Sequence, residues 1–112
     1  MNETKRSDFD TLIRARLEEL TALSASAERS QAVVELDQQA VGRLSRMDAL
    51  QNQAMAKAQK TNRNIETHRL KAALQRLEDG EYGYCEDCGD RIPDGRLKLD
   101  LAASKCVSCA SG

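Results

Sequence analysis

Apolar residues recur at helical spacing through the first quarter of the chain. From Phe9 onward the series advances in steps of four and three: Phe9, Ile13, Leu17, Leu20, Ser24 and Ala27. This spacing predicts one narrow seam along a helix, and the residues between are mostly Arg, Glu, Thr and Ser, as expected of its solvated side. Ser7 with Asp10 three residues later resembles a capping box, so we expect the helix to begin there and Met1 to Arg6 to form a polar tail.

The apolar pattern is interrupted between Arg29 and Arg43 and then resumes. The interval fits neither a clean seam nor a strand of useful length, and we expect a turn there. The stretch from about Leu44 to Asp79 is rich in residues that favour helix, and Gly80 stands where helices commonly end with a left-handed residue. The seam predicted for this second helix comprises Met47, Leu50, Ala54, Ala58, Ile65, Ala73, Leu74 and Leu77.

Two helices joined by a short turn pack antiparallel, so residues 1–80 are predicted to form a helical hairpin with its tip at about 30–43. Such a hairpin buries little apolar surface, and small domains of this kind commonly use a metal as an additional fastening. Residues 81–112 would supply it. The predicted fold class is mainly α, an antiparallel two-helix coiled-coil hairpin with a small four-cysteine zinc-finger module at its base.

Two cysteine pairs in the last quarter of the chain carry the metal prediction. They are Cys85 with Cys88 and Cys106 with Cys109, and each pair encloses two residues. Such a pair can wrap one edge of a zinc tetrahedron, and two pairs complete the four ligands. Gly89 follows the first pair, where the backbone often needs a positive φ, whereas Ala110 follows the second, so the second turn must differ or carry strain.

Four thiolate ligands leave no open coordination position, so the sequence predicts one structural Zn²⁺ and no metal-based hydrolysis. Two disulfides are the alternative, which a reducing cytosol disfavours. The chain shows no paired carboxylate site, no nucleophile with an adjacent base and no phosphate-cradling loop, and we therefore do not expect an enzyme.

Composition further limits the kinds of protein that this chain can be. Of 112 residues, 31% are charged and the net charge is only -1, which argues against binding to nucleic acid by bulk electrostatics. One Phe, two Tyr and no Trp exclude a large aromatic core. The start of the chain lacks the apolar region of a signal peptide, and no apolar run is long enough to span a membrane, so we expect a cytoplasmic protein with no membrane partner.

The segment LEDGEYGYCEDCGDRIPDGRLKLDLAASKCVSCA closely resembles the zinc-finger signature of the DksA/TraR family of bacterial transcription regulators. The Tyr-Gly-x-Cys at Tyr82 to Cys85, the Cys-Gly that follows, Ile92 and the pair Arg96-Leu97 carry the resemblance. That family also has a helical hairpin before the finger, so the resemblance covers nearly the whole chain. It implies a regulator that binds RNA polymerase directly, inserts its hairpin tip into the secondary channel and alters the stability of promoter complexes, without sequence-specific DNA binding. We expect a monomer, although the sequence does not fix the oligomeric state.

The resemblance also implies acidic residues at the hairpin tip. Family tips carry Asp-x-x-Asp-x-Ala, whereas this chain has GluLeuAspGlnGlnAla at Glu35 to Ala40, an incomplete match. Asp37 is the first candidate for the polymerase-active residue and Glu35 the second, and Asp48 is the third if the turn lies later. The alternative is that Asp37 simply caps the second helix.

Regulation by the alarmone guanosine tetraphosphate is doubtful. Longer family members have basic residues near the second cysteine pair, and a helix after it, that help to form an alarmone site with polymerase. Here Asp100 stands where arginine can occur and Ala110 where lysine can follow, and the sequence ends three residues after Cys109. Arg69 is the basic residue that could still contact the alarmone or the channel rim. We expect a weak alarmone response or none.

Alternatives of other classes remain. The second helix is locally basic through Lys57, Lys60, Arg63, Arg69, Lys71 and Arg76. These residues could dock on an acidic channel rim, although a solvated helix surface is favoured. A nucleic-acid-binding finger is disfavoured because four basic residues between Cys85 and Cys109 face five acidic ones. A purely structural or zinc-reserve protein is the third hypothesis.

Overall fold

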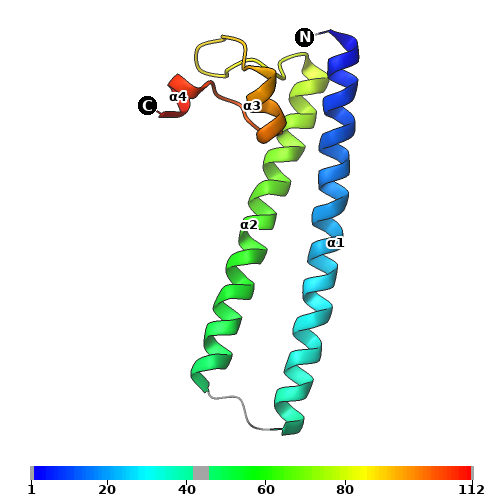
Figure 1. Cartoon of the computed structure of the whole chain (residues 1–112), viewed down its shortest axis with the longest axis vertical. Helices are drawn as coiled ribbons and strands as arrows, with labels where there is room; N and C mark the ends of the chain where they lie inside the picture. The colour runs from blue at the N-terminus through cyan, green and yellow to red at the C-terminus, as the bar shows by residue number, and fades with distance from the viewer. Residues whose placement is uncertain (1, 42–45, 112) are drawn as a thin grey trace. The chain divides into compact units, whose positions relative to one another are not determined.

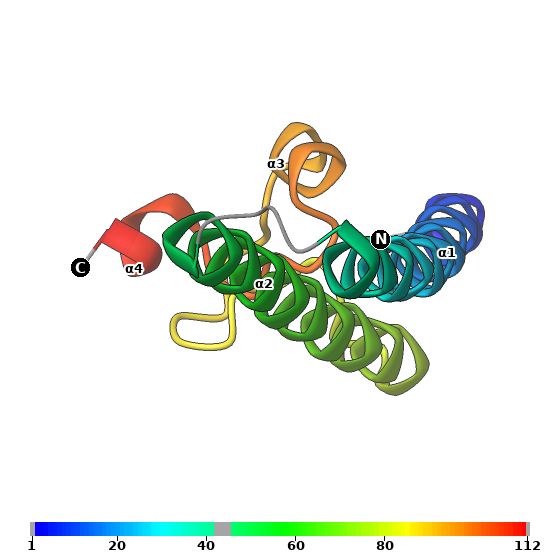
Figure 2. The same ribbon diagram turned by 90° about the horizontal axis from the view of Figure 1, so that it is seen from below.

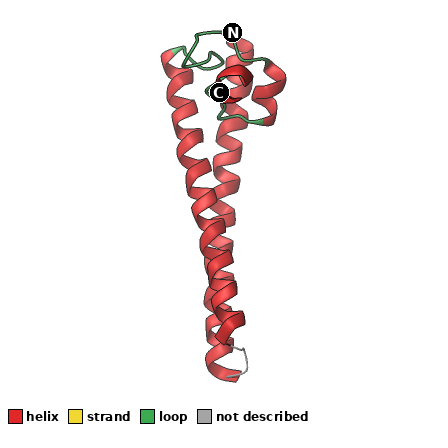
Figure 3. Ribbon diagram, turned by 90° about the vertical axis from the view of Figure 1, so that its left-hand side faces the viewer, coloured by secondary structure: helices red, strands yellow, loops and turns green. Residues whose placement is uncertain are grey.

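The computed structural model describes the backbone of residues 2–41 and 46–111 and the side chains of residues 2–30 and 46–110. The described helices are α1 (Glu3–Val41), α2 (Arg46–Asp79), α3 (Asp94–Leu99) and α4 (Val107–Ser111). Over the described residues, β-structure is limited to an isolated antiparallel bridge between Tyr84 and Arg91. The fold is mainly α, as predicted (Figures 1 and 3). No described helix combines the length and apolar character needed to cross a membrane.

Helix α1 begins earlier than predicted. The side chain of Asn2 accepts a hydrogen bond from the backbone N–H of Lys5 at 2.8 Å, which is an N-cap interaction. The polar residues before Ser7 are therefore helical rather than a tail, and Ser7 instead accepts a hydrogen bond from the Thr11 hydroxyl through its carbonyl. The capping-box prediction at Ser7 was wrong because a stronger cap lies five residues upstream.

Helix α1 also ends later than predicted. We expected a turn between Arg29 and Arg43, but the helix continues to Val41 and α2 begins at Arg46. The interrupted apolar pattern therefore did not mark a break in the helix. The chain has no proline and no glycine before Gly42, so nothing in residues 30–41 stops a helix. The connection between the helices falls in residues 42–45, outside the described residues.

Contacts divide the chain into two compact units. Unit 1 comprises Met1–Leu17 and Glu66–Gly112, and unit 2 comprises Glu18–Ile65. In each unit α1 and α2 lie side by side in opposite directions, and the view along the helices shows them as neighbours (Figure 2). The buried apolar side chains of unit 1 are Phe9, Ile13, Leu70, Ala73, Leu77, Tyr82, Cys85, Ile92, Leu97, Ala102 and Ala103. This core joins both long helices to the cysteine-rich segment.

Along α1 the predicted seam is confirmed wherever side chains are described. Phe9, Ile13 and Leu20 are buried, and the other three members of the series are half-buried. Hydrogen bonds flank this seam in both units. Arg16 donates to both carboxylate oxygens of Glu66 at 2.8 and 3.1 Å in unit 1, and Arg63 donates to the Ser24 hydroxyl at 3.1 Å in unit 2.

Along α2 the predicted seam holds only near the end of the helix. Ala73 and Leu77 are buried and Leu74 is half-buried, but the five predicted members within unit 2 are exposed: Met47, Leu50, Ala54, Ala58 and Ile65. The side that is partly covered there repeats every seven residues and consists of Ala49, Ala56 and Arg63. Small alanines in this register allow close approach of α1, and the larger apolar side chains are left on another face.

Helix α2 ends at Asp79 and Gly80 follows it, as predicted. Gly80 has a φ of +78°, and its N–H donates to the carbonyl of Leu77 at 3.3 Å. The next N–H, of Glu81, donates to the carbonyl of Arg76 at 2.8 Å. This pair of bonds is a Schellman motif, which satisfies the last helical carbonyls and turns the chain toward the first cysteine pair.

Candidate metal centre

The first cysteine pair lies on a tight backbone loop. The N–H of Cys85 donates to the carbonyl of Asp90 at 2.7 Å, and the N–H of Gly89 donates back to the carbonyl of Cys85 at 2.9 Å. Gly89 has a φ of +77°, a conformation that costs a residue with a Cβ about 1 kcal/mol or more. The predicted glycine-dependent turn is thereby confirmed at this pair.

The second pair uses a short helix in place of a glycine turn. Cys106 directly precedes α4 and Cys109 lies within it, and the N–H of Ala110 donates to the carbonyl of Cys106 at 2.9 Å. Residues three apart on a helix share a face, so both sulfurs can point the same way. Among the described residues, only glycines have positive φ. The prediction that this turn must differ is confirmed, and it differs without strain at Ala110.

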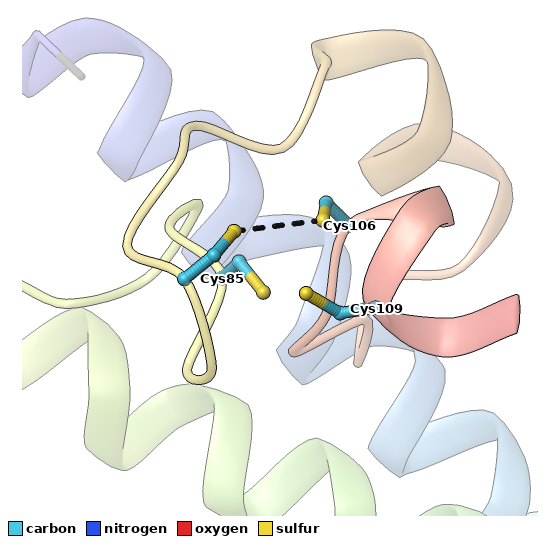
Figure 4. A group of neighbouring side chains, drawn as sticks. Cys85, Cys106 and Cys109 are labelled. Atoms are coloured by element: carbon cyan, nitrogen blue, oxygen red, sulfur yellow. Dashed lines mark hydrogen bonds between the residues drawn. The ribbon is translucent and has the colours of Figure 1, made fainter. Parts of the chain in front are cut away.

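The four sulfurs converge. All four Sγ atoms of Cys85, Cys88, Cys106 and Cys109 lie within 4.8 Å of one another. The Sγ atoms of Cys88 and Cys106 are 3.7 Å apart, close to the edge of about 3.8 Å that four Zn–S bonds of 2.3 Å would form in a tetrahedron. Figure 4 shows the sulfurs of Cys85, Cys106 and Cys109 pointing toward a common space. The arrangement fits one four-coordinate Zn²⁺, and all four cysteines are free thiols rather than disulfides.

The acid–base properties of the four cysteines are those of a cluster that needs a bound cation to become fully ionised. Hydrogen bonds from backbone amides, first that of Cys106, lower the pKa of Cys85 to about 6. Hydrogen bonding to neighbouring sulfurs, first that of Cys106, raises the pKa of Cys109. Four thiols this close therefore do not all ionise by themselves, whereas a divalent cation among them holds all four as thiolates. With every ligand supplied by cysteine, the zinc is structural.

Tyr82 fastens the zinc module to the helices of unit 1. Its ring is 2% exposed and its centroid lies 5.5 Å from that of Phe9 on α1. Its hydroxyl donates to the carbonyl of Leu101 at 2.7 Å. Burial raises the pKa of Tyr82 to about 12. The Tyr82 side chain thus joins α1 to the segment that leads to Cys106, and its backbone N–H donates to the carbonyl of Arg76 on α2 at 3.1 Å.

Arg76 supports the same segment from α2, a role that the sequence did not indicate. Its Nη2 donates to the carbonyls of Ala102 and Ala103 at 3.3 and 3.4 Å. Within the described residues, Arg76 Nε is buried without a hydrogen-bond partner. We expected this arginine to belong to the solvated basic surface. Nothing in the local pattern distinguishes it from its basic neighbours, because its partners are backbone carbonyls more than 25 residues away.

Ion pairs complete the attachment of the finger. Lys5 of α1 and Asp94 of α3 lie 2.8 Å apart, and Arg91 lies 3.1 Å from the same carboxylate. The hydrogen bond from Lys5 is the main reason that the pKa of Asp94 is lowered. These pairs are partly exposed, so solvent screens them and each contributes little to stability.

The residues predicted to contact polymerase or the alarmone are not part of the metal centre. Arg69 pairs with Asp100 at 2.9 Å within unit 1, and its alarmone or channel-rim role stays a prediction. Asp48 lies in the first turn of α2 with an exposed side chain. The remaining tip candidates, Glu35, Asp37 and Ala40, fall on residues whose side chains lie outside the described part of α1.

Comparison with known sequences identifies the zinc module. Residues 80–112 match the family described as prokaryotic dksA/traR C4-type zinc finger. An uncharacterized protein from Aquifex aeolicus is 45% identical over 38 residues, which are 34% of this chain and 26% of that protein. The RNA polymerase-binding transcription factor DksA of Salmonella typhimurium is 27% identical over 112 residues, covering 97% of this chain and 71% of that protein. The first relative is thus matched over only about a quarter of its length.

Comparison with solved structures supports the fold. Transcription factor DksA2 from Pseudomonas aeruginosa superposes with a TM-score of 0.80 and 22% identity, covering 98% of this chain and 83% of that one. An RNA polymerase binding protein and transcriptional regulator from Chlamydia trachomatis superposes with a TM-score of 0.62 and 16% identity, covering 99% and 88%. At these identities the likeness concerns the fold alone. Both superpositions extend over nearly the whole chain, including the two long helices and the segment that carries the cysteines.

Proposed function

Because this chain belongs to the DksA/TraR family of zinc-finger proteins, we propose that it regulates transcription by binding bacterial RNA polymerase directly. The observation that carries the proposal is the likeness to an RNA polymerase-binding transcription factor over 97% of the chain. The metal centre is consistent with this role, since a zinc with four cysteine ligands supports a fold and offers no site for hydrolysis.

The charges of the finger favour a protein partner over DNA. Three of its four cations are engaged within the module: Arg91 pairs with Asp94, Lys105 pairs with Asp87, and Arg96 donates to the carbonyl of Lys105. Phosphate binding needs lysine and arginine side chains that are available to the backbone of the nucleic acid. We therefore propose no direct sequence-specific DNA binding.

We further propose that the connection between α1 and α2 enters the secondary channel of the polymerase. A carboxylate brought close to a catalytic Mg²⁺ can perturb the metal and its ligands without any catalytic residue on the regulator. Because α1 continues to Val41, so that the connection lies later than expected, Asp48 joins Asp37 as a leading candidate. Asp37 lies four residues before the end of α1, and Asp48 lies in the first turn of α2. Glu35 and Ala40 are secondary candidates on α1.

The lifetime of promoter open complexes tests this mechanism. The zinc-loaded protein is added to polymerase at a promoter, and decay is followed after a competitor is introduced. We expect the wild-type protein to change the lifetime, and Asp37→Ala or Asp48→Ala to remove the effect while polymerase binding persists. Asp8→Ala, which changes an exposed aspartate in unit 1, is the matched control and should behave as wild type. If both tip variants retain the full effect, the proposed tip carboxylates are wrong.

A further inference from the structure

An exposed row of apolar side chains runs along α2 in unit 2. Met47, Leu50 and Ile65 are 78%, 57% and 53% exposed, and Ala54 and Ala58 are exposed as well. Their spacing places them on one face of the helix. These five residues form the apolar row of α2, which spans about 27 Å at 1.5 Å per residue.

The apolar row does not face α1. The side of α2 that α1 partly covers in this unit carries Ala49, Ala56 and Arg63. Since each helical residue advances by about 100°, the apolar row lies roughly 160° around the helix from that side. A helix with apolar residues on two nearly opposite faces has one face available for a second helical neighbour.

A basic edge borders the apolar row. Lys57 lies beside Leu50, about 20° away around the helix, and Lys60 lies one turn further along, on the side toward α1. The sequence has no Asp or Glu from Ala49 to Ile65. Across residues 2–30 and 46–110, no carboxylate forms an ion pair with either lysine. Both lysines also line a groove of about 260 Å³ between α2 and α1, where Glu28 is the one acidic lining residue among those described. The edge is therefore positively charged and accessible.

We propose that the apolar row and the Lys57–Lys60 edge together form a docking surface for an amphipathic helix of another protein, one whose apolar stripe is bordered by carboxylates. The stripe would cover Met47, Leu50 and Ile65, and the carboxylates would pair with the two lysines. Helix-in-groove recognition of this kind uses apolar anchors spaced three and four residues apart. The inference does not depend on the proposed polymerase function, since it follows from this face alone.

Charge complementarity selects this occupant over two others. A second copy of the chain offers no carboxylate from Ala49 to Ile65, so two such faces would pair no opposite charges. An anionic membrane surface is favoured by helices with Trp, Phe or Leu on the apolar face, whereas this row has one leucine and no aromatic residue. Methionine is typical of adaptable protein-binding surfaces. An acidic helix satisfies both the apolar and the charged components.

A pair of synthetic peptides tests the proposal. Each has about 20 residues to match the length of the row, with leucines at steps of three and four. One carries glutamates along an edge of the leucine stripe, and the other carries lysines at the same positions. They are titrated into the ¹⁵N-labelled, zinc-loaded full chain, and amide chemical shifts are recorded. We expect the glutamate peptide to bind about tenfold more tightly, a difference of about 1.4 kcal/mol, and to shift resonances of residues 47–65.

Variants separate the two components of the surface. Leu50→Ser should weaken binding of the glutamate peptide, and Lys57→Glu combined with Lys60→Glu should reverse the preference toward the lysine peptide. The matched controls are Leu23→Ser on α1, a leucine that is 46% exposed, and Lys98→Glu on α3, and both should bind as the wild type does.

Three results would overturn the proposal. The first is equal binding of the two peptides, or chemical-shift changes mainly outside residues 47–65. The second is dimerisation of the chain alone through this face, seen by sedimentation, which would assign the surface to a second copy. The third is binding through these residues to phosphatidylglycerol vesicles with no preference between the peptides, which would assign it to a membrane.

Discussion

Arg69 on α2 donates from Nη2 to the Oδ2 atom of Asp100 at 2.9 Å. The other carboxylate oxygen of Asp100 accepts the backbone N–H of Ala102 at 3.2 Å. The ion pair thus connects the long helix to the segment between α3 and the second cysteine pair. The charge of Arg69 is thus balanced within the molecule.

The Arg69–Asp100 pair should contribute little to stability. Both side chains are nearly half exposed, and exposed pairs typically add about 0.2–1 kcal/mol. In urea unfolding of the zinc-loaded protein, a double-mutant cycle of Arg69→Ala and Asp100→Ala should give a coupling free energy below about 1 kcal/mol. Asp100→Asn, which can keep the hydrogen bond to Ala102, should lie nearer the wild type than Asp100→Ala. A coupling above about 2 kcal/mol would contradict this prediction.

Tyr82 should titrate far from its ordinary range. In a Tyr84→Phe background it is the only tyrosine in the chain, so absorbance at 295 nm reports it alone. We expect a midpoint near pH 12 in the folded protein, because burial disfavours the phenolate, and a return toward the ordinary value of 10.0 in urea. A folded midpoint near 10 would show that the ring is not buried between α1 and the finger.

The raised pKa of Tyr82 predicts the direction of the alkaline stability change. Because the folded pKa lies above the unfolded value, its contribution is fully present below pH 10 and is lost as pH rises from about 10 to about 12. Tyr82→Phe should lose roughly 1 kcal/mol through the missing bond to Leu101, and its stability should fall less steeply across that interval. The measurement is urea unfolding at a series of pH values.

Leu70 and Ile65 should differ sharply although both lie on α2. Leu70 is 2% exposed in the core of unit 1, and truncating a buried leucine costs about 2–5 kcal/mol, so Leu70→Ala should be strongly destabilising. Ile65 is 53% exposed, and Ile65→Ala should change the free energy of unfolding by about 0.5 kcal/mol or less. Similar costs for the two variants would mean that the apolar row is covered in solution.

Removal of zinc should unfold the finger. The purified protein should release one Zn²⁺ per chain to a chelator, with loss of amide-resonance dispersion over residues 80–110, because Zn²⁺ links the two cysteine pairs and the folding of such a module is coupled to metal binding. Cys109→Ser should reproduce this loss and Ser108→Ala, its neighbour, should not. Protein without zinc that keeps a dispersed spectrum, or that contains two disulfides by mass spectrometry, would contradict the structural role of the metal.

The sequence alone predicted those features of the fold and the metal centre that depend on residues close together in the chain. The spacing of the cysteines predicted the four-sulfur cluster, because two Cys-x-x-Cys pairs together supply the four ligands of one Zn²⁺. The series from Phe9 to Ala27 predicted which face of α1 is buried. The end of α2 at Gly80 followed from the need for a left-handed residue.

The features of the structure that were not predicted depend on contacts that the local sequence pattern does not encode. The seam of α2 in unit 2 could not be predicted, because alanines face α1 while the larger Met47, Leu50 and Ile65 lie elsewhere, and size usually marks burial. The length of α1 was missed because burial and helicity were treated as one signal. The roles of Arg76 and Lys5 rest on partners distant in sequence, which spacing does not reveal.

Direct binding to core RNA polymerase tests the central claim. The zinc-loaded chain, labelled at its N-terminus with a fluorophore, is titrated with purified bacterial core enzyme, and fluorescence anisotropy is followed, with Cys109→Ser as the variant that lacks the intact finger. We predict saturable binding at micromolar concentration or below that unlabelled wild-type chain competes away. An absence of binding at that concentration would contradict the proposed function, although the fold and the zinc centre would stand.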